Sequence, residues 1–469
     1  MAKELTSIQR QELDSAFEKA RKALAIFETY DQARVDRLCQ AVAAAISNKK
    51  VFTELAIMGV EESGLGDANG RPGKRFKVHG ILRDALRQKS VGLIEEDTVK
   101  GISKYAKPVG IIASVVPTTN PVLTPAGTAV YAIKARDAVI FSPHPRSKNT
   151  AFKAVEIMRE ALEREGAPAD IIQCVQNVNM TMTQTLMAEA DLVIATGGQG
   201  LVRAAYSSGT PAYGVGAGNS TMIIDETADL KEAARNTMMS KTSDFGSGCS
   251  ADGNLIIEAT IYDDLLKELQ AVGGYMANDE EKAMLKKVIW DEEGHRLPDT
   301  VAVAPQKLAK IAGFEIPEDR KFIFVEGDGI GREHFYSLEK LTTLFATYKY
   351  SGFENALKMM HAIYNTMGKG HSCGIYSFND EHIHRLALEA PVSRIMVRQP
   401  QSKANAGSFT NGMPMTSSLG CGTWGGNIIS ENVNLKHYMN VTWVSRPIAE
   451  DRPPLEELFG EFYDPELEK

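Results

Sequence analysis

The sequence is poor in cysteine and lacks any closely spaced cysteine pair. Its five cysteines are odd in number and far apart, and none forms a CxxC motif: Cys39, Cys174, Cys249, Cys373 and Cys421. This usage favours reduced thiols in a cytosol over a disulfide framework or a zinc site. We therefore expect no metal centre in this chain.

An excess of positive charge and a long apolar run are also missing. The 52 lysines and arginines are outnumbered by 60 aspartates and glutamates, which gives a net charge of -8. Such a chain offers no basic stripe for nucleic acid. No apolar run approaches the ~18 residues that span a bilayer, and residues 1–27 have the charge spacing of an amphipathic helix, not of a signal peptide. We expect a cytoplasmic protein with no nucleic-acid or membrane partner.

What the sequence does have is the composition of a large globular protein. At 469 residues, 43% of them hydrophobic, it exceeds the size of a single core. The first ~90 residues show helical periodicity, broken by the Gly-rich stretch 64–73. From Val109 onward, short apolar runs such as "VGIIASVVP" and "AVIFSP" alternate with amphipathic segments. This alternation is typical of βαβ units and predicts two α/β domains with parallel sheets.

Three glycine-rich stretches are candidates for ligand contact. "ATGGQG" follows the apolar run 192–196 and precedes a helical pattern, so the N–H groups of Gly197, Gly198 and Gln199 could face a phosphate. "GVGAGN" (214–219) is followed by the apolar "STMIID" and fails the context of a dinucleotide fingerprint. The loop 417–440 holds four glycines around a tryptophan and shapes either a site or an interface.

One cysteine stands in unusual surroundings. In "SKTSDFGSGCSADG" (240–253), Cys249 lies among small and polar residues with almost no bulk. A single cysteine is usually a small buried hydrophobe, so the local composition alone leaves a structural role open.

Several long motifs together identify a family. "PVGIIASVVPTTNPVLTPAGTAVYAIKARDAVIFSPHPRSKNTA", "ATGGQGLVRAAYSSGTPAYGVGAGN", "MSKTSDFGSGCS", "GKGHSCGIY" and "LGCGTWGGNIISENVNLKHYMN" resemble the CoA-acylating aldehyde dehydrogenases, above all the aldehyde-oxidising half of bifunctional alcohol/aldehyde dehydrogenases. The resemblance implies the aldehyde dehydrogenase fold. It assigns 1–220 to the nicotinamide-cofactor domain, 221–420 to the catalytic domain, and 421–469 to a return segment, oligomerisation strand and tail. Segment 92–108 belongs to the oligomerisation extension, so a homodimer or homotetramer is implied.

The resemblance also implies the catalytic and cofactor residues. Cys249 is the nucleophile, its backbone N–H and the side-chain amide of Asn120 stabilise the oxyanion, and His371 assists proton transfer or CoA entry. Glu339 holds the nicotinamide ribose of NAD or NADP; Arg146 is one candidate for a 2′-phosphate contact, although a surface arginine is the simpler interpretation. The implied cofactor-binding set is Thr118, Ser142, His144, Pro145, Gly197, Gly198, Gly216 and Glu339.

One departure concerns the fate of the acyl group. Ordinary aldehyde dehydrogenases hydrolyse the thioester with a glutamate that activates water, and here that position falls on Gly214. Without a carboxylate at this point, the thiol of coenzyme A is the better nucleophile. The sequence therefore favours thiolysis, with CoA as co-substrate.

A second departure concerns the aldehyde. The residues around the thiol are small or polar where acetaldehyde enzymes carry bulk, and we assign Ser243, Phe245 and Ser247 to the substrate pocket. Hydroxyls suit an anionic, oxygen-rich aldehyde, so sulfoacetaldehyde is the expected substrate. Cationic partners are Arg394 and Arg398, which share a face if they lie on one strand, and Lys403. Succinate semialdehyde, acetaldehyde or propionaldehyde, and a non-catalytic scaffold are the alternatives.

Overall fold

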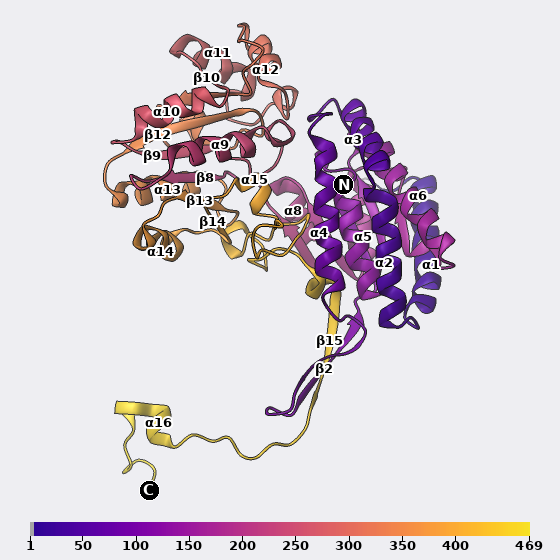
Figure 1. The fold of residues 1–469 in the computed structure, drawn as a ribbon. Coiled ribbons are helices and arrows are strands. Elements are labelled where there is room, and N and C mark those ends of the chain that lie inside the picture. The colour runs from indigo at the N-terminus through magenta and orange to yellow at the C-terminus, as the bar shows by residue number, and fades with distance from the viewer. Residues whose placement is uncertain (1–3) are drawn as a thin grey trace.

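The computed structural model describes residues 4–469, which form two α/β lobes and a thin arm (Figure 1). The lobes lie side by side, and the arm runs away from them toward the C-terminus. Each lobe is built on its own parallel sheet, whereas the arm is a small antiparallel sheet. This is the predicted α/β architecture with two parallel sheets and a β extension, and that prediction is confirmed.

The first lobe contains a five-stranded parallel sheet in the order β5-β4-β3-β6-β7. All six residues of both β3 and β4 are buried, because helices cover both faces of a parallel sheet and each strand must be apolar throughout. The strands are β3 (Ile111–Val116), β4 (Ala138–Pro143), β5 (Ile172–Cys174), β6 (Leu192–Thr196) and β7 (Ala212–Val215).

The helices of this lobe begin and end at residues suited to those positions. Thr6 forms a capping box with Gln9 at the start of α1, and Gly64, in the left-handed region at φ 70°, ends α3. The predicted helical region thus breaks at the Gly-rich stretch. The helices are α1 (Ser7–Phe27), α2 (Gln32–Ser47), α3 (Lys49–Ser63), α4 (Arg75–Leu86), α5 (Leu123–Ala135), α6 (Lys148–Arg164), α7 (Met180–Glu189) and α8 (Gln199–Tyr206).

The second lobe contains a seven-stranded parallel sheet in the order β10-β11-β12-β9-β8-β13-β14. Its core includes a packed group of rings, Phe322, Phe324 and Phe345. The strands are β8 (Thr221–Ile224), β9 (Asn254–Glu258), β10 (Gly274–Met276), β11 (Phe322–Glu326), β12 (Leu344–Tyr350), β13 (Cys373–Tyr376) and β14 (Ile395–Val397); the helices are α9 (Leu230–Lys241), α10 (Tyr262–Ala271), α11 (Asp279–Ile289), α12 (Pro305–Ala312), α13 (Phe353–Thr366), α14 (Asp380–Glu389) and α15 (Gln401–Ala404).

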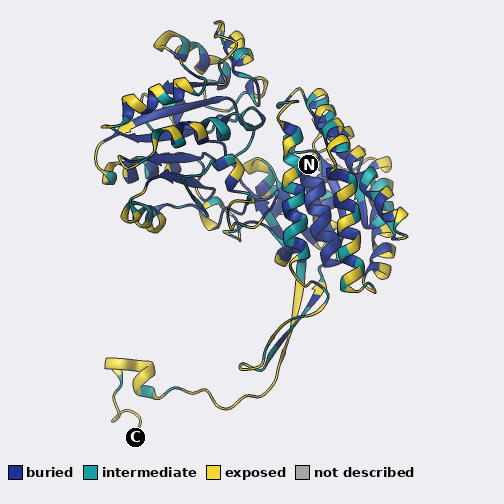
Figure 2. Cartoon of the chain, viewed as in Figure 1, coloured by how far each residue is buried: buried dark blue, intermediate teal, exposed yellow. Residues whose placement is uncertain are grey.

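The arm brings together segments far apart in the sequence. β1 (Gly92–Asp97) and β2 (Ile102–Pro108) form a hairpin, and β15 (Met439–Ser445) pairs antiparallel with β2 along its whole length. Beyond β15 the chain continues as an extended tail with one short helix, α16 (Leu455–Phe459). Figure 2 shows both sheets as buried, while β15 and the tail are exposed.

One strand is shorter than its pattern predicts. Arg394 and Arg398 would share a face on one strand, but β14 covers only Ile395–Val397. Arg398 instead has φ 53°, in the left-handed region. The two arginines therefore flank the strand and go to different places. In the part of the chain that the structure describes, we also find no helix with the length and apolarity that a bilayer span requires.

Candidate active site

A cleft of about 1200 Å³ is lined by residues of both lobes. The first lobe contributes the carboxyl ends of its strands, including Val116 of β3 and Thr196 of β6, and the second contributes the segment around Cys249. Small-molecule sites form at the carboxyl ends of strands in parallel sheets. The cleft is therefore the natural place for a nucleotide to meet a reactive thiol.

The loop that carries Cys249 has a constrained backbone. Asp244 and Phe245 both adopt left-handed conformations, with φ 49° and 51°, which non-glycine residues rarely do. On the facing loop, a Cβ at Gly218 would lie 1.9 Å from the carbonyl oxygen of Cys249. The glycine thus allows the loop 214–219 to pack directly on the backbone of the cysteine.

Cys249 lies against a histidine. Its Sγ is 3.0 Å from Nε2 of His371, and Nδ1 of His371 is 2.8 Å from Oγ of Ser372, which orients the ring. Burial, with a smaller effect of Glu339, raises the pKa of the thiol to about 12, while burial and Arg394 lower the pKa of the imidazole to about 3. At neutral pH the pair is a neutral thiol beside a neutral imidazole.

Asn120 lies at the turn before α5 and lines the same cleft. Its main chain is fixed by a bond from its N–H to the carbonyl of Pro117 and by one from the N–H of Thr124 to its own carbonyl, both 3.2 Å long. Its side-chain Oδ1 accepts a hydrogen bond of 2.7 Å from Nζ of Lys74. The amide nitrogen is therefore the end that remains available as a donor.

Lys74 belongs to a charged cluster that sequence reasoning missed. The carboxylate of Asp244 accepts from Nζ of Lys74 at 2.7 Å, from Nη2 of Arg71 at 3.0 Å and from Oγ of Ser247 at 2.8 Å. Arg71 and Asp244 are almost fully buried, and Lys74 is 22% exposed on the cleft side. Burial acts to raise the pKa of Asp244, but the two cations outweigh it and hold that pKa below its usual value.

All eight predicted cofactor residues line the cleft: Thr118, Ser142, His144, Pro145, Gly197, Gly198, Gly216 and Glu339. Oγ1 of Thr118 is buried and has no hydrogen-bond partner within the described chain. Gly198 directly precedes α8 and lines the cleft, so the N-terminus of that helix, with its free backbone N–H groups, lies at the cleft. Arg146 does not line the cleft; its guanidinium donates to the carbonyl of Ser63.

Glu339 faces the same cleft from the second lobe. Its Oε1 accepts from the backbone N–H of Gly218 at 3.1 Å. Burial raises the pKa of the carboxyl to about 7, although this hydrogen bond acts in the opposite direction. Its second carboxylate oxygen, Oε2, accepts no hydrogen bond within the described residues, and such an acceptor suits the hydroxyls of a ribose. The donors and acceptors present, Thr118, Gly198 and Glu339, thus fit a nicotinamide dinucleotide.

The predicted substrate residues divide into two groups. Ser243 and Ser247 line the cleft, and so does Lys403. Phe245, whose backbone has φ 51°, is absent from the lining, so the structure does not place it in the predicted substrate pocket. Arg398 is held outside the cleft by an ion pair of 2.8 Å with Glu232.

Arg394 has an internal role in place of the predicted substrate contact. It is 4% exposed, and its Nη1 donates to the carbonyl of His371 at 3.0 Å. Its second amino group donates to the carbonyl of Gly420. Arg394 therefore ties the histidine segment to the glycine-rich loop 417–440.

Gly214 lies on β7 with its α-hydrogens against α8. A Cβ at this position would lie 2.8 Å from side-chain atoms of both Val202 and Tyr206. Within the described residues, the carboxylates lining the cleft are Asp244, which is bound to two cations, and Glu339. Gly214 itself has no side chain that could act as a base toward water.

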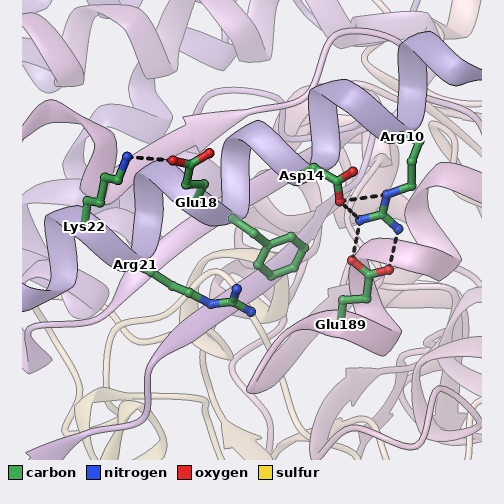
Figure 3. A pocket seen from close by; sticks show the side chains of 7 residues that line it. Arg10, Asp14, Glu18, Arg21, Lys22 and Glu189 are labelled. Carbon is green, nitrogen blue, oxygen red and sulfur yellow. Dashed lines mark hydrogen bonds and ion pairs between the residues drawn. The ribbon is translucent and has the colours of Figure 1, made fainter.

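A second cavity, of about 330 Å³, lies along α1 (Figure 3). All of its charged groups except Arg21 pair with one another: Arg10 bridges Asp14 and Glu189, and Lys22 binds Glu18. Exposed pairs of this kind contribute little to stability. They join α1 to the end of α7.

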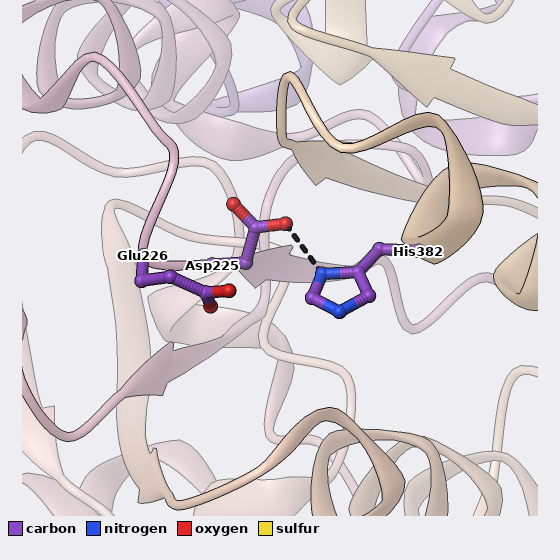
Figure 4. A group of neighbouring side chains, drawn as sticks. All are labelled: Asp225, Glu226 and His382. Atoms are coloured by element: carbon purple, nitrogen blue, oxygen red, sulfur yellow. Dashed lines mark hydrogen bonds and ion pairs between the residues drawn. The ribbon is translucent and has the colours of Figure 1, made fainter.

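A second group of ionisable side chains lies at α14 (Figure 4). Asp225, Glu226 and His382 bring ligand atoms within 4.8 Å of one another. Asp225 already binds Nδ1 of His382 at 2.8 Å, and the imidazole stacks on Phe353 with centroids 3.9 Å apart. Hydrogen bonding and stacking account for this group as part of the packing of α14.

Comparison with known proteins agrees with this geometry. Residues 2–283 match the model of the aldehyde dehydrogenase family. Sulfoacetaldehyde dehydrogenase of Acholeplasma sp is 42% identical over 449 residues, 95% of this chain and 93% of that protein. Sulfoacetaldehyde dehydrogenase (acylating) of Bilophila wadsworthia is 40% identical over 95% of this chain and 97% of that protein. The crystal structure of an acetylating aldehyde dehydrogenase from Geobacillus thermoglucosidasius has a TM-score of 0.91 and 35% identity, and the match covers 96% of this chain and 100% of that one.

A parallel-sheet lobe that fits a nucleotide faces a half-buried thiol, and together with these matches this defines an oxidoreductase that acts on aldehydes: the chain belongs to the aldehyde dehydrogenase family. Within that family it is an NAD(P)-dependent acylating aldehyde dehydrogenase, which passes the acyl group to coenzyme A.

Proposed function

We propose that this enzyme oxidises sulfoacetaldehyde to sulfoacetyl-CoA through a thioester on Cys249. The observation that carries the proposal is the cleft itself: a thiol 3.0 Å from a neutral imidazole, with Ser243, Ser247 and a lysine in the lining. Two relatives at 42% and 40% identity carry the name of this substrate, which supports the same choice.

The first chemical step is attack by Cys249. As Sγ bonds to the carbonyl carbon, its proton moves to Nε2 of His371, 3.0 Å away, which accepts it when the neutral imidazole carries its own proton on Nδ1, toward Oγ of Ser372. Because neither group is charged beforehand, the charge separation arises only as the carbonyl reacts. The neutral pair thus keeps the thiol unreactive until an aldehyde is present.

The negative charge that develops on the carbonyl oxygen needs donors already in place. The amide nitrogen of Asn120 and the backbone N–H of Cys249 fill that role. When bound in the cleft, a nicotinamide would supply the acceptor for the hydride of the same carbon. Thr118, Gly198 and Glu339 would hold that nucleotide, with the carboxylate of Glu339 accepting from ribose hydroxyls.

The resulting thioester on Cys249 is attacked by the thiol of coenzyme A. The new C–S bond forms, the bond to Cys249 breaks, the proton of the coenzyme A thiol leaves to solvent, and the cysteine regains the proton that His371 accepted. His371 is the group next to the sulfur that can return it. The carboxylate of Asp244 already accepts hydrogen bonds from Arg71, Lys74 and Ser247, so its oxygens are occupied and it is not placed to activate water.

An anionic aldehyde suits the charges beside the thiol. The charges of Arg71, Lys74 and Asp244 are engaged with one another, so a cation for the substrate must come from elsewhere on the lining. Lys403 adds a cation on the lining. A sulfonate in this cleft would meet the positive charge of Lys403 and the hydroxyl of Ser243, whereas an alkyl aldehyde would leave them unused.

The test is a panel of aldehydes assayed for NADH or NADPH formation with CoA present. The proposal expects kcat/KM for sulfoacetaldehyde to exceed that for acetaldehyde and propionaldehyde by at least about 100-fold. Equal efficiency on acetaldehyde would contradict the anionic substrate. A preference for succinate semialdehyde would retain the anionic pocket and replace the sulfonate by a carboxylate. No turnover with any aldehyde would indicate a non-catalytic scaffold.

A further inference from the structure

Lys74 contacts the proposed oxyanion donor directly. Its Nζ donates to Oδ1 of Asn120 at 2.7 Å. An ammonium group is a donor only, so the amide must present its oxygen to Lys74 and its NH₂ group to the other side. Within residues 4–469, Nδ2 of Asn120 donates no hydrogen bond, and Asn120 lines the cleft that holds Cys249.

Asp244 and its other partners hold Lys74 in place. Its Nζ also donates to Asp244 at 2.7 Å, and the same carboxylate accepts from Nε and Nη2 of Arg71 and from the backbone N–H of Asp67. A Cβ at Gly66 would lie 1.9 Å from Nη2 of Arg71, so this ion pair packs tightly against a glycine with φ 99°. The ammonium group therefore has one fixed position.

We propose that Lys74 is a positioning residue for catalysis: it locks and polarises the Asn120 amide so that its N–H groups face the carbonyl oxygen of the substrate. The positive charge of the Lys74 ammonium beside Oδ1 draws electron density from the amide and strengthens its N–H groups as donors. Oxyanion stabilisation depends on donors that need no reorganisation when the charge develops. Arg71 and Asp244 act indirectly, because they fix the position of Lys74. This inference rests on the role proposed for Asn120.

The alternative is that Lys74 binds the anionic end of the substrate, and the two roles have different kinetic signatures. A residue that acts only in the transition state changes kcat and kcat/KM equally, for charged and uncharged aldehydes alike. A residue that binds the sulfonate changes KM, and only for the charged aldehyde.

The experiment compares Lys74→Met and Lys74→Arg, alone and combined with Asn120→Ala, on sulfoacetaldehyde and propionaldehyde. Lys74→Met leaves Asp244 paired with Arg71. The matched control is Lys282→Met, which removes a lysine from its ion pair with Asp328, outside the cleft lining. We expect Lys74→Met to lower kcat about 10- to 100-fold on both aldehydes with little change in KM. Lys74→Arg, which keeps the charge, should recover most of that loss, and Lys282→Met should change neither constant.

The double variant gives the decisive comparison. If Lys74 acts through Asn120, Lys74→Met should change the rate of the Asn120→Ala enzyme by less than about 2-fold. The alkylation rate of Cys249 by iodoacetamide, a reaction with no carbonyl oxyanion, should match the wild-type rate in Lys74→Met. Independent, multiplicative losses, slower alkylation or a change in KM confined to sulfoacetaldehyde would each overturn the inference. A harmless Asn120→Ala would instead refute the role proposed for Asn120.

Discussion

At the scale of single residues, the site depends on groups whose pKa values are shifted by burial. Cys249 and His371 are both neutral at physiological pH because burial disfavours each charged form. Glu339 lies close to its titration point, with a pKa of about 7. Among these groups, Glu339 is the one whose charge changes near neutral pH, so it carries a pH dependence that an experiment can isolate.

The affinity for the nicotinamide nucleotide should rise with pH through Glu339. The ionised carboxylate accepts ribose hydroxyls, whereas the protonated form offers one acceptor fewer, so the dissociation constant should fall as pH rises between about 6 and 8. Fluorescence titration of NAD and NADP across this range measures it. Glu339→Gln should bind more weakly with a flat profile, and Glu333→Gln, an exposed carboxylate of the same segment, should keep the wild-type slope. A retained slope in Glu339→Gln would contradict this assignment.

The role of a residue could be predicted from the sequence where that residue lies in a recognisable motif. The motifs around Cys249, Asn120 and Glu339 supplied their candidate roles, and the structure brings all three to one cleft. The Lys74–Asp244 pair was not predictable, because its members are 170 residues apart and lie in no joint motif. The spacing of Arg394 and Arg398 was misleading, since the strand between them has only three residues.

At the scale of elements, loops bring the chemistry together. The segment 214–219 begins in the last two residues of β7, and the loop that carries Cys249 follows α9. The two are in contact where Gly218 lies on the backbone of Cys249. The apolar runs of the sequence predicted the strands well because strands buried on both faces are uninterrupted. The loop contacts were invisible in the sequence, since they depend on how two lobes meet.

Gly218→Ala should therefore impair activity by moving the nucleophile. The added Cβ would lie 1.9 Å from the carbonyl oxygen of Cys249, and backbone cannot yield as a flexible side chain does. We expect kcat/KM to fall at least about 100-fold, because small displacements of reacting groups are costly. Gly412→Ala, at a position with open space around it, should retain wild-type kinetics. Wild-type activity in Gly218→Ala would contradict the described contact.

At the scale of the whole molecule, the arm stands apart from the lobes. β15 forms the outer edge of a three-stranded sheet, and Trp443 is 61% exposed on it. Exposed edge strands are templates for pairing with another chain. The exposed tail beyond β15 carries further apolar side chains, including Phe462 and Leu467. This geometry and the family resemblance both favour association through the arm.

We expect a homo-oligomer that depends on β15. The double substitution Val441→Asp and Trp443→Asp adds charge to the exposed edge strand and should lower the mass seen by light scattering to that of a monomer. Ile8→Asp, an equally exposed apolar position on α1, should leave the mass unchanged. A wild-type chain that is already monomeric, or a variant that keeps its mass, would contradict a role for the arm.

The central claim is that Cys249 holds an acyl group that waits for coenzyme A. The most direct measurement is a stopped-flow record of reduced nucleotide formed from sulfoacetaldehyde without CoA, followed by addition of CoA. The account predicts a burst of about one equivalent per active site, near-zero turnover afterwards, and steady turnover once CoA is added. Cys249→Ala should show no burst. Continued turnover of the wild type without CoA would mean that water discharges the thioester, and that result would contradict the account.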